Sequence, residues 1–262
     1  MMKLLLLSVA LLCTSLSVAF AEETSDVFES INLIHSNNPN VCILEPDESI
    51  QKQYYEYVFK DTFDAVQNVE NTMFEITGGN WHTPIYSFDY EEHADKFTSD
   101  FPQCNIFIEF EQLNDGMTTT GVDSLGFASY DHSNSNHRYS YVKVFLQAQL
   151  KQADISICIG CPEEENNELE FKNVYKYMSI DTVKKIVTHE YLHALGLGHY
   201  ILDRNPLNDV ESLMMTTLNP WAENKDNEMK EIDKEMLIKL YTEDGFGGRD
   251  GHVRDYEVSE LR

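Results

Sequence analysis

The feature that most constrains this chain is a stretch of eleven residues, from His189 to His199, that carries three histidines at fixed spacing. His193 lies four residues after His189, which on an α-helix places both imidazoles on the same face. Glu190 follows the first histidine, and Gly196 stands where a helix can end in a left-handed turn. Such a turn lets the chain double back and bring His199 to the other two. The spacing therefore predicts a metal site with three imidazole ligands and an open fourth position, the arrangement of a catalytic zinc ion.

The pattern H-E-x-x-H-x-x-G-x-x-H resembles the signature of the metzincin zinc peptidases, which carry a buried methionine turn (Met-turn) further along the chain. The segment Ser212-Leu213-Met214-Met215 is similar to that turn, with Met214 in the matching place and Met215 as the alternative. The resemblance extends to the order of elements over roughly residues 40–242, which is matrixin-like. Tyr200, directly after the third histidine, matches none of the residues that usually mark a subfamily, so the subfamily stays open.

The resemblance implies an α+β fold with a twisted, mostly parallel sheet, a long helix and the zinc helix packed on it, and a small C-terminal lobe. That lobe contains the Met-turn and a final helix. The resemblance also implies that His189, His193 and His199 hold one zinc ion and that Glu190 activates a zinc-bound water. The function expected is an exported zinc endopeptidase that acts on a protein or peptide. The alternatives are a zinc amidase acting on a non-protein amide and a catalytically silent metal-binding or adhesion module.

Hydrophobic periodicity places the secondary structure around this motif. Strands are expected over residues 40–44, 84–90, 105–111, 126–130, 139–146 and 154–159. Helices are expected from about residue 46 to the Gly78-Gly79 pair, over about 179–195 and over about 227–241. Residues 126–129 resemble the edge strand that pairs with an extended substrate, and a plain sheet strand fits the same residues equally well.

The start of the chain predicts export. Lys3 precedes a short apolar run, and Ala19-Phe20-Ala21 forms a cleavage site, so residues 1–21 are interpreted as a signal peptide. The mature chain is then secreted and has no stable association with the membrane. Residues 22–245 are expected to form one catalytic domain, with an upper lobe over about 40–198 and a lower lobe over about 199–245. Residues 22–40 are expected to be loosely held, and residues 246–262 to form a mobile tail.

Cysteines at positions 42, 104, 158 and 161 remain after the predicted cleavage, an even number that indicates two disulfides in an exported protein. Four cysteines allow three connectivities, of which we favour Cys42–Cys104 and Cys158–Cys161. The alternatives for Cys158 and Cys161 are half of a zinc knuckle or a redox pair. Cys42 as a switch that blocks the zinc ion fits its surroundings poorly.

The charge of the chain excludes one class of partner. With 45 acidic and 19 basic side chains, the net charge is −26, which repels nucleic acid. In the Ser- and Asn-rich segment that follows Asp131, His132 and His137 are interpreted as solvated loop residues rather than ligands of a second metal. Residues 114–136 lack the spaced ligands of a calcium loop, so calcium stays unsupported. The oligomeric state is left open.

Overall fold

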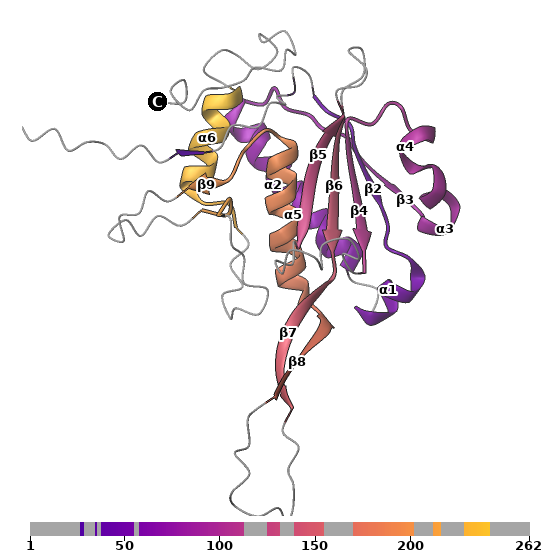
Figure 1. Cartoon of the computed structure of the whole chain (residues 1–262). Coiled ribbons are helices and arrows are strands. Elements are labelled where there is room, and N and C mark those ends of the chain that lie inside the picture. Colours follow the sequence, from indigo (N-terminus) through magenta and orange to yellow (C-terminus); the bar gives the residue numbers. More distant parts are fainter. Residues whose placement is uncertain are drawn as a thin grey trace, which may run out of the picture.

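The structure is a computed structural model of the whole chain and describes residues 27–28, 35, 38–54, 58–112, 125–131, 139–154, 170–201, 212–215 and 228–241. These residues form an α+β fold, in which a five-stranded sheet is covered by helices and followed by a short C-terminal helix (Figure 1). The predicted fold class is confirmed at this level.

The central sheet is mostly parallel, and its strand order is β3–β2–β4–β6–β5. The strands are β2 (Val41–Leu44), β3 (Ile85–Phe88), β4 (Ile106–Glu111), β5 (Gly126–Asp131) and β6 (Tyr139–Phe145). Only β5, at one edge, runs antiparallel to its neighbour. All five strands were expected from the sequence, and successive residues of a strand face opposite sides of the sheet. In β4, for example, Ile106 and Ile108 belong to the main core on one face, whereas Phe107 packs on the other.

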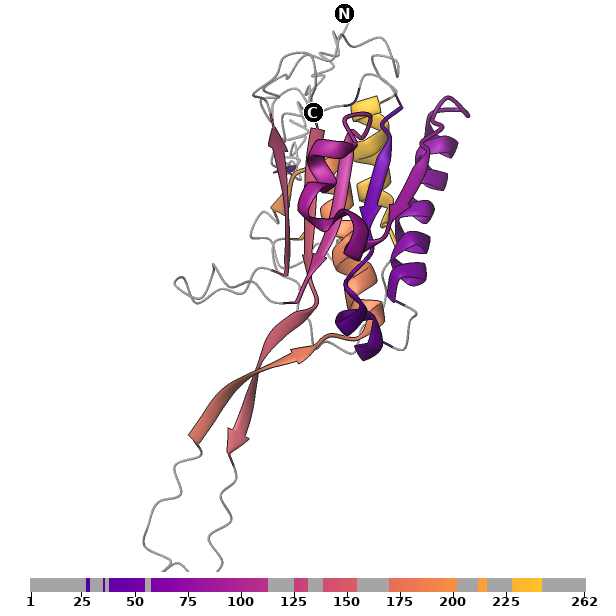
Figure 2. The ribbon, with the colours of Figure 1, turned by 90° about the vertical axis from the view of Figure 1, so that its right-hand side faces the viewer.

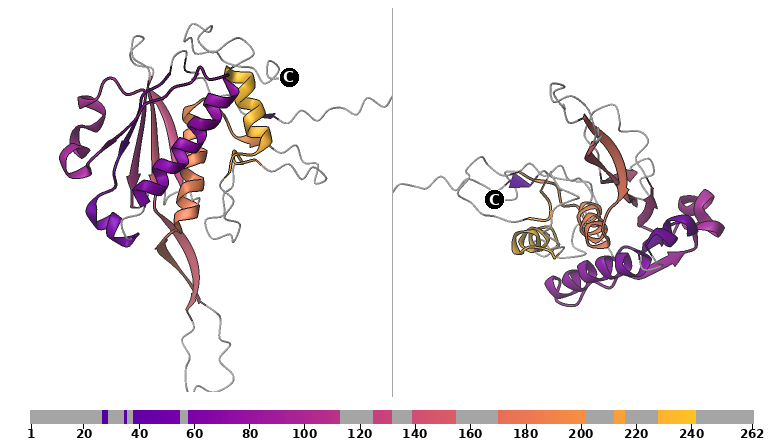
Figure 3. Two further views of the ribbon diagram at one scale, coloured as in Figure 1. Left: turned by 180° about the vertical axis from the view of Figure 1, so that it is seen from behind. Right: turned by 90° about the horizontal axis from the view of Figure 1, so that it is seen from below.

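Three helices lie on one face of the sheet and enclose the main core (Figures 1 and 3). They are α2 (Val58–Ile76), α5 (Ile180–Ala194) and α6 (Glu231–Tyr241). Val66, Val69 and Met73 recur at helical spacing in α2 and are buried in the main core, where α2 packs against α5. The side chain of Ser179 caps α5 by accepting a hydrogen bond from the Thr182 amide at 3.2 Å.

The helix that the sequence predicts from residue 46 onward is two helices, α1 (Glu48–Gln53) and α2. Asp47 caps α1 by accepting hydrogen bonds from two backbone amides. The helix ends at Gln53, and the hydroxyl of the next residue, Tyr54, donates a hydrogen bond to the carbonyl of Leu146 at 3.2 Å. A tertiary contact at this break is invisible to helical periodicity, so the sequence did not indicate where α1 ends.

The opposite face of the sheet carries a second, smaller core under α3 (Tyr90–His93), a 3-10 helix (Ala94–Lys96) and α4 (Phe97–Asp100). These short helices were not expected from the sequence. The predicted disulfide Cys42–Cys104 lies in this core and is confirmed, with both cysteines fully buried beside Phe97 and Phe107. The disulfide ties β2 to the residues that lead into β4.

A two-stranded ribbon extends away from the body of the molecule between β6 and α5 (Figure 2). It consists of β7 (Gln147–Asp154) and β8 (Glu170–Tyr177), which pair antiparallel over their full lengths. The strand expected over 154–159 overlaps β7 only at Asp154, because residues 155–169 lie outside the described part of the chain. Cys158 and Cys161 are among them, so their pairing stays a prediction.

The N-terminal segment was expected to be loosely held, and this is wrong at two points. Strand β1 (Val27–Phe28) pairs antiparallel with β9 (Tyr200–Ile201). In addition, Nε2 of His35 donates a hydrogen bond to the carbonyl of Ala194 at 3.0 Å. Among the described residues, no helix is long and apolar enough to cross a membrane.

Candidate metal centre

The three histidines singled out in the sequence converge on one point at the C-terminal end of α5. His189 and His193 lie one helical turn apart and are almost completely buried, while His199 follows the helix and is half-buried. The Nε2 atoms of His189 and His193 are 3.1 Å apart, and both lie 3.2–3.3 Å from Nε2 of His199. In the described part of the chain, these residues form the one group of three or more potential ligands close enough to share a metal ion.

The size of this triangle fits a tetrahedral metal. Zinc–imidazole bonds of 2.0–2.1 Å place two ligand nitrogens about 3.3 Å apart at a tetrahedral angle. All three separations lie within a few tenths of an ångström of that value. The three nitrogens take three corners of the tetrahedron around the ion, and the fourth corner is left for another ligand. The arrangement can therefore hold one metal ion with three protein ligands.

Hydrogen bonds at the far side of two rings fix their tautomers. Nδ1 of His189 donates to the carbonyl of Leu213, and Nδ1 of His193 donates to the carbonyl of Leu197, both at 2.7 Å. A carbonyl oxygen only accepts, so Nδ1 carries the proton and Nε2 keeps its lone pair. The Nε2 lone pairs of His189 and His193 face each other at 3.1 Å and repel. A cation between the two nitrogens removes this repulsion, because each lone pair then binds the cation. The donor set thus matches what a metal ion requires.

Burial keeps the same two histidines neutral. Desolvation lowers the pKa of His189 to about 4 and that of His193 to about 3. Both rings are therefore unprotonated at neutral pH, even before a metal binds. Metal ligation requires this form, because a protonated imidazole has no lone pair to offer.

The turn after α5 brings the third histidine to the other two, as the sequence predicted. Gly196 has a φ of 99°, a left-handed conformation that residues with a Cβ rarely adopt. Its amide donates to the carbonyl of His193 at 2.8 Å, and the Leu197 amide donates to the carbonyl of Leu192 at 3.0 Å. This closes the helix and reverses the chain toward His199.

The segment predicted to be a Met-turn lies beside the metal centre. Met214 is fully buried in the main core, and the carbonyl before it, that of Leu213, accepts the hydrogen bond from His189. The segment is held by Asp233 of α6, which is completely buried. The Asp233 carboxylate accepts hydrogen bonds from the Ser212 hydroxyl at 2.5 Å and from the Leu213 amide at 3.0 Å. Met215 is only half-buried, which favours Met214 for the matching place.

Asp233 is a residue that the sequence reasoning missed. It lies on the apolar face of the final helix, and an acidic residue at such a position was the only sign in the sequence that this side chain is buried. Besides the Ser212 hydroxyl and the Leu213 amide, its carboxylate accepts a hydrogen bond from the Lys230 amide at 3.1 Å. A buried carboxylate with these donors ties the start of α6 to the segment that touches His189.

Glu190 points from α5 toward the edge strand β5 and is only 6% exposed. A Cβ at Gly126 would lie 2.7 Å from Cγ and 2.8 Å from Oε1 of Glu190, so any other residue there would displace the Glu190 side chain. Burial raises the pKa of Glu190 to about 8. The structure thus places a desolvated carboxyl group, on the residue directly after His189, against the sheet edge.

A second set of buried polar groups joins α5 to α2 and α6. The Glu70 carboxylate of α2 accepts hydrogen bonds from the Trp81 indole and from the hydroxyl of Tyr191, the residue after Glu190. Burial raises the pKa of Glu70. The hydroxyl of Tyr241 in α6 donates to the Leu195 carbonyl at 2.6 Å. These contacts fix α5 against both neighbouring helices, α2 and α6.

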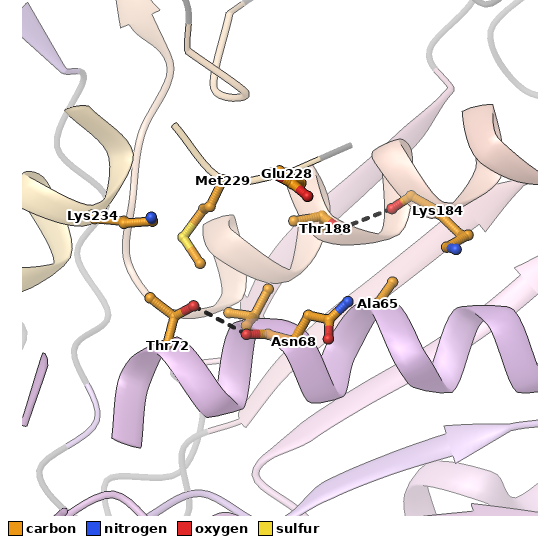
Figure 4. Close-up of a pocket in the computed structure, with 9 residues that line it drawn as sticks. Ala65, Asn68, Thr72, Lys184, Thr188, Glu228, Met229 and Lys234 are labelled. Carbon is orange, nitrogen blue, oxygen red and sulfur yellow. Dashed lines mark hydrogen bonds between the residues drawn. The ribbon is translucent and has the colours of Figure 1, made fainter. Parts of the chain in front are cut away.

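A cavity of about 340 Å³ lies between α2, α5 and the residues that precede α6 (Figure 4). Asn68 and Thr72 of α2, Lys184 and Thr188 of α5, and Met229 contribute to its lining. None of the three histidines lines it. The cavity is therefore separate from the metal centre.

Several predicted positions lie outside the described part of the chain. They include residues 1–21, His132, His137 and the tail over 246–262. Tyr200 begins β9, directly after the third histidine.

Fold and site together define an α+β protein with a three-histidine site that can hold a metal ion. No model of a known protein family matches the chain, and a search of curated proteins finds no match. The assignment of the site consequently depends on the geometry of His189, His193 and His199.

Proposed function

We propose that this protein is an exported zinc endopeptidase of the metzincin type. The observation that carries the proposal is the triangle of three Nε2 atoms, 3.1–3.3 Å apart, with a buried glutamate next to the first histidine. Three neutral imidazoles and an open position are typical of catalytic rather than structural zinc. The Met-turn-like segment, with Met214 buried beneath the ligands' helix, supports the same class.

In this proposal His189, His193 and His199 hold the zinc ion, and Glu190 handles protons. A bound zinc ion supplies a Lewis acid for the scissile carbonyl and makes water nucleophilic at neutral pH. In the metal-free chain the Glu190 carboxyl keeps its proton, because burial raises its pKa to about 8. A neighbouring dication favours the ionised form, in which Glu190 accepts a proton from water and passes it to the leaving amine.

The position of β5 supports a peptide as the substrate. It is one of the two edge strands of the sheet, and its first residue, Gly126, lies against Glu190. An extended peptide can add to such an edge through its backbone, which places its amide bonds beside the proton-transferring group. Residues 126–129 are then the substrate-binding strand.

Export is the second part of the proposal. It rests on the apolar start of the chain with its Ala-x-Ala site and on the buried Cys42–Cys104 disulfide, which is typical of oxidising compartments. Residues 1–21 are then a signal peptide and residues 22–245 the catalytic domain.

The experiment is cleavage of a broad peptide mixture by the chain without residues 1–21, read by mass spectrometry. Wild type with one equivalent of zinc is expected to cut internal peptide bonds. Glu190→Gln is expected to bind zinc equally well and to cut at least 100-fold more slowly, since a general base contributes about 10²–10⁴-fold. A zinc-loaded wild type that cuts nothing overturns the proposal and leaves the amidase and the silent binding module.

A further inference from the structure

A second cavity, of about 480 Å³, lies between α2 and the residues that lead into β3. It shares no lining residue with the cavity of Figure 4, and none of the three histidines lines it. A volume of this size is typical of a site for a small molecule. Polar and aromatic side chains dominate the lining, among them Gln67, Glu70, Asn71, Phe74, Trp81 and His82.

The carboxyl group of this cavity is that of Glu70, which is only 4% exposed. It accepts hydrogen bonds from neutral donors, the Trp81 indole and the Tyr191 hydroxyl, and the Thr83 hydroxyl lies beside it. Among the described residues, no lysine or arginine forms an ion pair with it. Buried carboxylates are normally paired with a cation, because removing a lone charge from water is costly. The negative charge of Glu70 is therefore uncompensated by the protein.

Glu70 can accept from one further donor. A carboxylate has about four lone-pair sites, and neutral donors from Trp81, Tyr191 and Thr83 account for three. The side-chain oxygens of Gln67 and Asn71, one turn apart on the same helix, add further acceptors to the lining. The cavity thus combines one negative charge with several oxygen acceptors.

The mouth of the cavity is aromatic. Phe74 is 45% exposed, the highest value for a large apolar side chain in the described part of the chain. Its ring centroid lies 5.2 Å from that of His82, which is also exposed. An aromatic ring attracts a cation over its face and offers an apolar surface to alkyl groups. A buried carboxylate behind such a ring favours a ligand that is cationic at one end and apolar along its stem.

We propose that this cavity binds a primary alkylammonium group, with the ammonium on Glu70 and the alkyl stem against Phe74. A primary ammonium carries three donors on a compact cation, which matches several oxygen acceptors around one negative charge. Free amines and lysine side chains share this chemistry. The proposed site is separate from the metal centre and does not depend on peptidase activity.

The fluorescence of Trp81 provides the measurement, because its indole donates to Glu70. The chain contains two tryptophans, so Trp221→Phe leaves Trp81 as the sole emitter. This protein, without residues 1–21, is titrated at about pH 8, where an alkylamine is protonated. The ligands are n-butylammonium, 1-butanol as its neutral match, and Nα-acetyl-lysine N-methylamide. Each titration is run with zinc and in EDTA, because an amine nitrogen is itself a metal ligand.

n-Butylammonium is expected to change the Trp81 emission saturably and with the same affinity in zinc and in EDTA. We expect 1-butanol, and n-butylammonium on Glu70→Gln, to bind about 10-fold or more weakly, since a hydrogen bond to a charged group is lost. Phe74→Leu removes the ring and is expected to weaken binding about 3-fold. Glu75→Gln removes the same charge from an exposed position of α2 outside the cavity and is the matched control, with affinity unchanged. The lysine derivative distinguishes the sources: binding as tight as that of the amine assigns the site to lysine side chains, and weaker binding assigns it to free amines.

Three results would overturn the inference. The first is equal binding of 1-butanol and n-butylammonium, or no saturable response to either, because the charge of Glu70 is then not recognised. The second is an affinity for the amine that stays unchanged in Glu70→Gln. The third is a response seen only with zinc, which places the amine at the metal centre and leaves the proposed peptidase untouched. Far-UV circular dichroism checks that Glu70→Gln is folded, and if it is not, the comparison of amine with alcohol decides by itself.

Discussion

The carbonyl oxygen of Leu213 lies 2.7 Å from Nδ1 of His189, although the two residues are 24 positions apart in the chain. This hydrogen bond orients the first imidazole so that its Nε2 faces the other two histidines. Its acceptor is held in place by Asp233, which binds the amide of the same leucine. The ligand geometry of α5 therefore depends on a carboxylate from α6.

Replacing Asp233 tests that dependence. The two oxygens of the Asp233 carboxylate accept hydrogen bonds from Ser212, Leu213 and Lys230. In Asp233→Asn one of these oxygens becomes an NH₂ group, which cannot accept them. We expect about a 10-fold loss of zinc affinity and a loss of about 2–4 kcal/mol in the free energy of unfolding. Chelator competition and urea unfolding measure the two effects. Glu235→Gln, an exposed change in the same helix, is the control, and equal behaviour of both variants would refute the role of Asp233.

Gly126 is predicted to control catalysis rather than metal binding. A Cβ in Gly126→Ala would meet Glu190 at 2.7–3.0 Å, so the carboxyl group has to move away from its position. A displacement of about 1 Å can cost about 100-fold in rate, and we expect peptide cleavage to slow by about 10- to 100-fold while zinc affinity stays nearly unchanged. Steady-state kinetics with a cleaved peptide provide the test. Ser87→Ala, an exposed change on the opposite edge strand β3, should remain close to wild type.

The metal-free protein is predicted to lose stability on mild acidification. Desolvation lowers the pKa of His35 to about 4, below its ordinary value of 6.5, and His189 and His193 are shifted in the same direction. Between pH 6.5 and 4 these histidines are protonated in the unfolded chain but remain neutral in the native chain. The free energy of unfolding is therefore highest above pH 6.5 and falls as the pH decreases. Each histidine contributes about 1–2 kcal/mol between about pH 7 and pH 5. Urea unfolding in EDTA measures the slope.

His35→Gln provides the control for that slope. The variant lacks one titrating group, so its stability should fall by about 1–2 kcal/mol less than that of wild type between about pH 7 and pH 5. Parallel curves for the two proteins would show that the burial of His35 does not contribute.

The Cys42–Cys104 disulfide is predicted to be a major source of stability. It closes a loop with a sequence separation of 62 residues, and a loop of that length corresponds to about 4 kcal/mol of unfolding free energy. Urea unfolding of Cys42→Ala with Cys104→Ala, compared with wild type, measures the loss. Cys158→Ala with Cys161→Ala serves as the comparison. A loss below about 1 kcal/mol for the first pair would contradict the prediction.

Much of the fold was predictable because its signals are local. The strands β4 and β6 show a two-residue period, and α5 has an apolar face with a capping serine before it. The break between α1 and α2 was not predictable, because Tyr54 is hydrogen-bonded to Leu146, which lies between β6 and β7 and is far away in the sequence. The short helices over residues 90–100 have too few residues to show a period, and their packing around Cys42–Cys104 exists only in the folded chain.

The candidate site divides in the same way. The candidate ligands could be inferred from the sequence, since His189, His193, Gly196 and His199 are related by helical spacing and one turn, which depend only on neighbouring residues. The tertiary structure decided what surrounds the ligands: the Leu213 carbonyl on its Asp233 support, Gly126 against Glu190, and the pairing of Phe28 with Tyr200. Each of these contacts joins residues far apart in the chain. They form only when α5, α6 and the sheet pack together, and no local pattern of residues encodes that packing.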